Sequence, residues 1–191
     1  NKKTEHAPYV RDSIDLKRTM ILVVLALLPA FFFGTYNVGL QSPEVINKDF
    51  ITCFLYGLKI VIPMYLVVFT VGGLFEALFA VIRGHEINEG FIVTGFLIPL
   101  TMPPTIPLWM LAIATIFGVV IGKEIFGGTG YNIFNPALTA RAFLFFAYPS
   151  YMSGNKPWIA PLDGLSQATP LLEKSSNLDM TYSWWDMFYG Y

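Results

Sequence analysis

The longest run of residues without a charged side chain restricts the fold of this chain more than any other feature. It covers residues 91–122. A helix needs about 20 apolar residues to cross a bilayer, so this run is too long for one span. Four prolines interrupt it: Pro99, Pro103, Pro104 and Pro107. We therefore expect two helices that meet at a break near residues 102–109.

Three further segments have the pattern of membrane helices. Residues 20–36 are uncharged, and residues 60–82 contain one charge, Glu76. Asn135 and Pro136 form a typical helix start, with Asn as the N-cap and Pro at the first helical position, and this helix runs to about residue 148. Charged residues make up 13% of the chain, against about 25% in soluble domains. The pattern predicts an all-α polytopic membrane protein with about five transmembrane helices in residues 19–150.

The proline-rich break has two interpretations at this stage. It is either a turn outside the membrane or the gap in a discontinuous helix, a device with which transporters line a site at membrane depth. The sequence leaves both open.

The distribution of basic residues predicts the orientation, because cytoplasmic loops are enriched in Lys and Arg. Five of the 12 basic residues precede the first apolar tract: Lys2, Lys3, Arg11, Lys17 and Arg18. Five spans place Arg83 and Lys123 on the same side as these, and Lys48, Lys156 and Lys174 on the other. We therefore expect residues 1–18 to be cytoplasmic and residues 151–191 to be periplasmic.

Several classes of function are disfavoured by composition. A net charge of −1 gives no basic surface for nucleic acid. Cys53 is the single cysteine, which excludes a disulfide framework or a thiolate metal cluster within this chain. His6 and His85 have no partners at metal-ligand spacing, so we predict no metal site of that kind.

The segment from Asp163 to Thr169 is small and polar. Its composition fits an ordinary surface turn, and it also offers the Thr169 hydroxyl to a modifying enzyme. The pattern Asp-x-x-Ser-x-Ala-Thr resembles the acceptor motif of the periplasmic flavin transferase. That resemblance implies a covalent FMN, linked through its phosphate to Thr169, with Asp163 and Ser166 recognised by the transferase. Gln167 stands where the commoner form of the motif has Gly, and a Gln there is similar to the D subunit of the Rnf complex.

Five longer segments carry a wider resemblance. They are residues 10–18, 71–76, 85–90, 127–132 and 141–149. These segments resemble the family that includes the B subunit of the sodium-translocating NADH:quinone oxidoreductase. The resemblance implies ten spans in two inverted five-helix halves, like a urea channel, of which this chain holds the first half. It also implies a multi-subunit complex of the bacterial inner membrane, in which electron transfer from NADH through flavins to quinone is coupled to Na⁺ export.

Glu76 is the candidate for handling sodium or protons. A carboxylate within a span costs a few kcal/mol and is therefore functional by default. Two structural roles are also open to Glu76. Because it lies about two helical turns from Arg83 at the cytoplasmic end of the span, its carboxylate could reach the membrane interface. It could also hydrogen-bond a neighbouring helix. In the family, the matching Glu is implicated in sodium uptake.

The remaining candidates concern quinone and a second flavin. Gly72 and Gly73 lie mid-helix, where each costs about 1 kcal/mol relative to Ala, so they serve helix packing or a ligand. The family resemblance places quinone near Gly72, Gly73, Phe143 and Phe145. Family members also carry a noncovalent riboflavin. The glycine-rich turn at residues 127–130 leads to Asn132, Asn135 and Arg141, which we consider as its contacts.

Two rival functions remain. The first is the D subunit of the Rnf complex, a resemblance that implies the same fold and covalent flavin but electron transfer from ferredoxin. Residues 85–90 and 141–149 favour the sodium pump over this alternative. A passive urea-type permease shares the fold and needs no flavin. No NADH-binding fingerprint occurs in this chain, so we expect another subunit to oxidise NADH.

Overall fold

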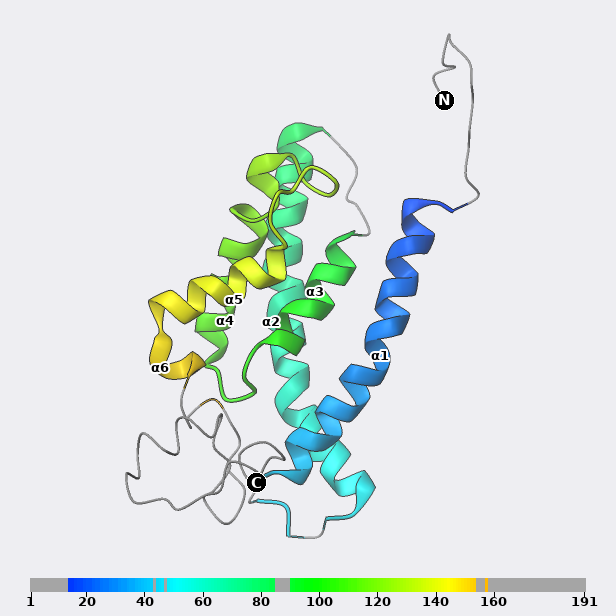
Figure 1. Cartoon of the computed structure of the whole chain (residues 1–191), viewed down its shortest axis with the longest axis vertical. Coiled ribbons are helices and arrows are strands. Elements are labelled where there is room, and N and C mark those ends of the chain that lie inside the picture. The colour runs from blue at the N-terminus through cyan, green and yellow to red at the C-terminus, as the bar shows by residue number, and fades with distance from the viewer. Residues whose placement is uncertain (1–13, 43, 47, 85–89, 154–156, 158–191) are drawn as a thin grey trace, which may run out of the picture.

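The computed structural model describes residues 14–42, 44–46, 48–84, 90–153 and 157. Within these ranges every regular element is helical (Figure 1). Three helices are long and apolar enough to cross a membrane, namely Leu16–Leu40, Phe50–Arg83 and Leu108–Phe126, and two apolar helices are shorter. The prediction of an all-α polytopic membrane protein is confirmed.

The first two helices run antiparallel along the length of the molecule (Figure 1). Helix α1 spans Leu16–Leu40 and α2 spans Phe50–Arg83. Both are longer than the apolar tracts from which they were predicted, because α1 begins at Leu16 and α2 continues through Lys59. It ends at Gly84, whose φ of 68° is the left-handed conformation that glycine adopts readily.

The long uncharged run is split as predicted. Helix α3 covers Gly90–Thr101 and α4 covers Leu108–Val120. The chain descends α3 to the break and returns upwards through α4, so both helices lie on the same side of the break (Figure 1). Met102 and Ile106, in the break, are buried in the main apolar core. The break is therefore part of the packed interior. Its two interpretations, a turn outside the membrane and the gap in a discontinuous helix, both stay predictions.

A compact turn connects α4 to α5, which spans Pro136–Ala147. The short helix η1, Glu124–Phe126, comes first, followed by three glycines with positive φ: Gly127, Gly128 and Gly130. The predicted N-cap of α5 is confirmed, because Asn135 Oδ1 accepts hydrogen bonds from the backbone N–H groups of Ala137 and Leu138 at 3.0 and 3.4 Å. Helix α6, Pro149–Met152, follows.

Small residues bring the backbones of α1 and α2 very close together. A Cβ added to Gly39 would lie 1.8 Å from the carbonyl oxygen of Cys53, and one added to Gly57 would lie 1.9 Å from that of Thr35. Helices in lipid associate through such close approach, because burial between helices removes little water. Small side chains at this crossing therefore determine how α1 lies on α2.

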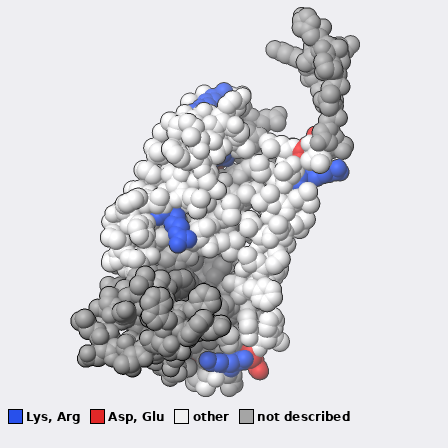
Figure 2. All heavy atoms as spheres, viewed as in Figure 1, with Lys and Arg blue, Asp and Glu red and all other residues white. Residues whose placement is uncertain are grey.

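The outer surface is apolar, as expected for contact with lipid. Large side chains such as Phe33, Val81 and Phe146 are 75%, 81% and 84% exposed. In Figure 2 the charged side chains on the visible face are few and separated by uncharged surface. Exposed apolar surface of this extent marks a membrane-embedded protein.

Candidate functional site: a buried charge cluster

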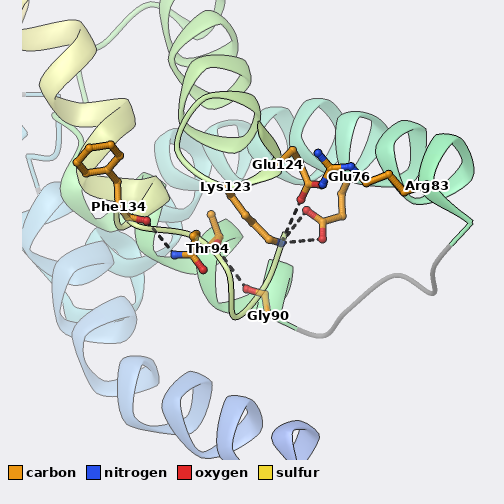
Figure 3. Close-up of polar contacts among 8 residues, drawn as sticks. Glu76, Arg83, Gly90, Thr94, Lys123, Glu124 and Phe134 are labelled. Carbon is orange, nitrogen blue, oxygen red and sulfur yellow. Dashed lines mark hydrogen bonds and ion pairs between the residues drawn. The ribbon is translucent and has the colours of Figure 1, made fainter. Parts of the chain in front are cut away.

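Glu76 pairs with a lysine that lies far away in the sequence. Glu76 is on the C-terminal half of α2 and is 3% exposed. The Lys123 ammonium, 2% exposed, donates to both of its carboxylate oxygens, at 2.6 and 2.7 Å (Figure 3). Of the two structural roles considered for Glu76, contact with a neighbouring segment is the one observed. The buried charge of Glu76 is thus compensated by a buried charge of opposite sign.

Local structure directs Lys123 inward. It lies where α4 gives way to η1, and its backbone N–H still donates to the carbonyl of Val119 at 3.2 Å. The preceding Gly122 packs closely on the start of α5, since a Cβ there would lie 3.2 Å from the Cα of Pro136. Lys123, which was predicted from the sequence only as one of the cytoplasmic basic residues, is thus an interior ion-pair partner of Glu76.

Two further charges complete the cluster. Glu124 is 1% exposed, with one oxygen 3.8 Å from Lys123 Nζ and the other 3.7 Å from a guanidinium nitrogen of Arg83. Neither oxygen of Glu124 has a hydrogen-bond partner in the part of the chain that the structure describes. Arg83 is 30% exposed and lies over the Phe79 ring, 5.4 Å from its centroid. With all four groups ionised, two carboxylates face two cations.

Lys123 and Glu124 were not predicted from the sequence as site residues. A signal was present, because Lys123-Glu124 follows the longest uncharged run of the chain at once. The pairing with Glu76 was not readable, since 47 positions separate the two residues. Carboxylate oxygens suit hard cations, and here an ammonium occupies those of Glu76.

The structure separates the residues considered for quinone. A Cβ added to Gly72 would lie 2.7 Å from the Phe91 ring, whereas one added to Gly73 would have ordinary contact distances to the same ring. Phe143 on α5 is half-buried and stacks on Phe117 with centroids 4.5 Å apart. Phe145 is 48% exposed. Packing thus accounts for Gly72 and Phe143, while Phe145 remains open to a ligand or lipid.

Two of the three residues considered for riboflavin share a cavity. This cavity of about 280 Å³ is lined by Asn132, Asn135, Lys123 and Thr129, among others. The Thr129 hydroxyl is buried and has no hydrogen-bond partner among the described residues. Arg141 is exposed and does not line the cavity. Asn132 Nδ2 donates to the carbonyl of Phe134 at 2.8 Å (Figure 3). Of the three candidates, Asn132 and Asn135 therefore line the cavity together with Thr129, and Arg141 does not.

A second, more open cavity of about 340 Å³ lies between α1, α2 and the proline-rich break. Its lining is mainly apolar and includes Phe31, Met64, Pro99 and Thr35. None of the residues singled out from the sequence as candidate site residues lines it.

The flavin-attachment motif cannot be placed. Asp163, Ser166 and Thr169 lie outside the described residues. Within the described ranges, no three His, Cys, Asp or Glu side chains gather in a way that could hold a metal ion.

Comparison with known proteins identifies the family. Residues 3–191 match the model of the NQR2, RnfD, RnfE family. The chain is 49% identical to the B subunit of the Na⁺-translocating NADH-quinone reductase of Chromohalobacter salexigens, over 98% of this chain and 52% of the relative. It is 46% identical to the B subunit of the same enzyme of Yersinia pestis, over 100% of this chain and 55% of the relative. The chain thus spans about half the length of the curated relatives it matches, and it belongs to the NQR2, RnfD, RnfE family.

Proposed function

We propose that this chain is the first half of a flavin-bearing subunit of a sodium-translocating NADH:quinone reductase in the bacterial inner membrane. The observation that carries the proposal is the buried Glu76, held by Lys123 beside a second carboxylate, Glu124. A membrane subunit that only anchored its partners would have no need of this cluster, because buried ion pairs add little to stability. The relatives described above are subunits of an enzyme that carries out this reaction, which supports the proposal.

In this function Glu76 binds the transported sodium ion. Its carboxylate is the one acidic group within the long α2 helix, and it lies in the half of α2 that ends at Arg83. Electron transfer to quinone, involving other subunits of the complex, supplies the driving force. This chain supplies the Glu76 carboxylate and the surrounding charged side chains, which influence the cation that this carboxylate binds.

The flavins and quinone belong to the same proposal. The motif from Asp163 to Thr169 supports a covalent FMN, attached by a periplasmic flavin transferase. A riboflavin would be held by Asn132, Asn135 and Thr129 at the polar cavity, and a bound flavin supplies one- and two-electron transfer. Quinone would lie near Gly73 or near the exposed Phe145, the two candidates for which packing does not account.

The proposed topology has a cytoplasmic N-terminal segment (residues 1–18) and a periplasmic tail (residues 151–191). The start of α1, the end of α2 and the turn after α4 lie at one end of the molecule, as Figure 1 shows, and the α1–α2 connection lies at the other. This arrangement supports the alternation inferred from the basic residues.

The test of the sodium role is Glu76→Gln in the full-length subunit within its complex. We expect the sodium concentration for half-maximal quinone reduction to rise or sodium dependence to be lost, with Glu44→Gln as the matched control. Glu44 is exposed and accepts a hydrogen bond from Tyr56 at 2.8 Å, far from the cluster in the sequence. Wild-type sodium dependence in an assembled Glu76→Gln complex would contradict the proposal.

The flavin attachment has its own test. In-gel flavin fluorescence of the subunit should be lost in Thr169→Ala and kept in Thr181→Ala, which changes a threonine outside the motif. A subunit without any covalent flavin would favour the urea-type permease. Reduction by ferredoxin rather than NADH would favour the D subunit of the Rnf complex.

A further inference from the structure

The Lys123 ammonium lies between two carboxylates and is closer to Glu76 than to Glu124. It contacts both oxygens of Glu76 within 2.7 Å and is 3.8 Å from the nearer oxygen of Glu124. Glu124 is almost fully buried, yet both of its oxygens lack a hydrogen bond within the described ranges. Leaving a buried charged acceptor without a hydrogen bond is costly. A second arrangement in which Glu124 gains a donor would recover part of that cost.

We propose that Lys123 is a built-in competitor for the cation at Glu76, and that its ammonium moves to Glu124 when sodium binds. The inference rests on the proposed sodium role of Glu76 and adds the identity of the group that sodium displaces. The distances make the exchange short, because the ammonium needs to move by little more than 1 Å relative to Glu124 to reach hydrogen-bonding range.

Charge balance assigns a role to Arg83 in this exchange. In the present arrangement Lys123 neutralises Glu76, and Arg83 approaches Glu124 at 3.7 Å without hydrogen-bonding it. If sodium neutralises Glu76 and Lys123 neutralises Glu124, then the Arg83 charge is in excess. Arg83 is already 30% exposed on the last turn of α2, so it can turn towards water. With all four side chains ionised, the buried charge then stays at zero throughout.

The mechanism predicts opposite effects for two substitutions in the full-length subunit within its complex. Lys123→Gln removes the competitor, so the sodium concentration for half-maximal quinone reduction should fall about tenfold. Glu124→Gln weakens the place to which the ammonium moves, so the same concentration should rise about tenfold. Glu44→Gln should match wild type.

Thermal stability provides a second readout that does not need turnover. The melting temperature of each purified complex is measured in NaCl and in KCl at equal ionic strength. Sodium should stabilise the Lys123→Gln complex more than wild type, because the ion then replaces the missing charge. If Lys123→Gln prevents assembly, then sodium should restore assembly and potassium should not.

The results separate this inference from the proposed function. If Glu76→Gln loses sodium dependence while Glu124→Gln and Lys123→Gln keep the wild-type value, then Glu76 handles sodium and the exchange with Lys123 is wrong. If Glu76→Gln itself keeps wild-type dependence, then the proposed function fails. A Lys123→Gln complex that is equally unstable in sodium and potassium also overturns the exchange.

Discussion

The two halves of helix α2 are held to their neighbours by opposite means. The N-terminal half meets α1 at Gly57 and at the backbone of Cys53: a Cβ added to Gly57 would clash with the Thr35 carbonyl, and one added to Gly39 would clash with the Cys53 carbonyl. The C-terminal half meets the α4–η1 junction through the Glu76–Lys123 ion pair. Close backbone contact leaves little room for movement, whereas the proposed exchange gives the cluster of four charges a second arrangement. On that proposal the first half of α2 orients the helix and the second half changes state.

The largest effect should come from breaking the ion pair on one side. Lys123→Met leaves the Glu76 carboxylate buried beside Glu124 without its donor, which should cost about 3–5 kcal/mol of stability. The double variant Glu76→Gln with Lys123→Met removes both charges and should recover much of that loss. Thermal denaturation of the complex in KCl measures both. Equal losses in the single and double variants would show that the pair is not coupled.

The α1–α2 crossing should be the next most sensitive region. Gly57→Ala places a methyl group against the carbonyl oxygen of Thr35, a backbone atom that cannot rotate away. We expect a cost near the upper end of the roughly 1–3 kcal/mol typical of overpacking, with unchanged sodium dependence in the complex that assembles. Gly34→Ala is the matched control, since no atom lies within 4 Å of a Cβ added there. A sodium effect of Gly57→Ala would contradict the division of α2 into two halves.

The two central glycines test packing against ligand binding. Gly72→Ala would crowd the Phe91 ring, a side chain that can shift, so we expect a loss of about 1–2 kcal/mol. Gly73→Ala makes an ordinary contact and should be neutral in stability. If Gly73→Ala nevertheless raises the KM for quinone, then the quinone proposal gains a residue for which packing has no explanation. An unchanged KM in both variants would remove these glycines from that site.

The smallest effect concerns the cap of α5. Asn135→Ala removes the acceptor for two backbone N–H groups and should cost about 1 kcal/mol, while Asn135→Asp keeps that acceptor and should be close to wild type. Flavin content gives the sharper result. If Asn135→Asp keeps stability but loses noncovalent flavin, then Asn135 contacts riboflavin as well as capping the helix. Loss of flavin only together with stability would assign Asn135 to the cap alone.

Much of the fold was predictable from local patterns. The helices and their break were predicted from three kinds of local signal: the apolar tracts, the proline cluster and the Asn135-Pro136 helix start. Each of these signals depends only on residues that are close together in the sequence. The helix ends were less predictable, because α2 carries Lys59 within its length and begins at Phe50. A long flexible lysine near the end of a span can keep its charge in a polar environment, which removes the signal for a boundary.

The candidate site was predictable only in part. An acid inside an apolar tract identified Glu76 as costly and therefore significant, and the family resemblance implied a role in sodium uptake. Its partner was not identifiable, since a lysine after a span is normally a loop charge. Arg141 illustrates the reverse, because it follows the glycine-rich turn closely in sequence and yet does not line the cavity beside that turn.

By itself the sequence determined the class of the protein, the positions of its helices and the presence of one charge that must be compensated. These properties depend on side-chain polarity and on backbone hydrogen bonding over short distances. Only the tertiary structure decided that Lys123 compensates Glu76, that Glu124 remains without a hydrogen bond among the described residues and that Arg83 lies beside it. Those contacts depend on how closely α2 and α4 pack and on where α4 ends. That geometry arises from many weak contacts between segments that are distant in the sequence, so it cannot be predicted from local sequence patterns.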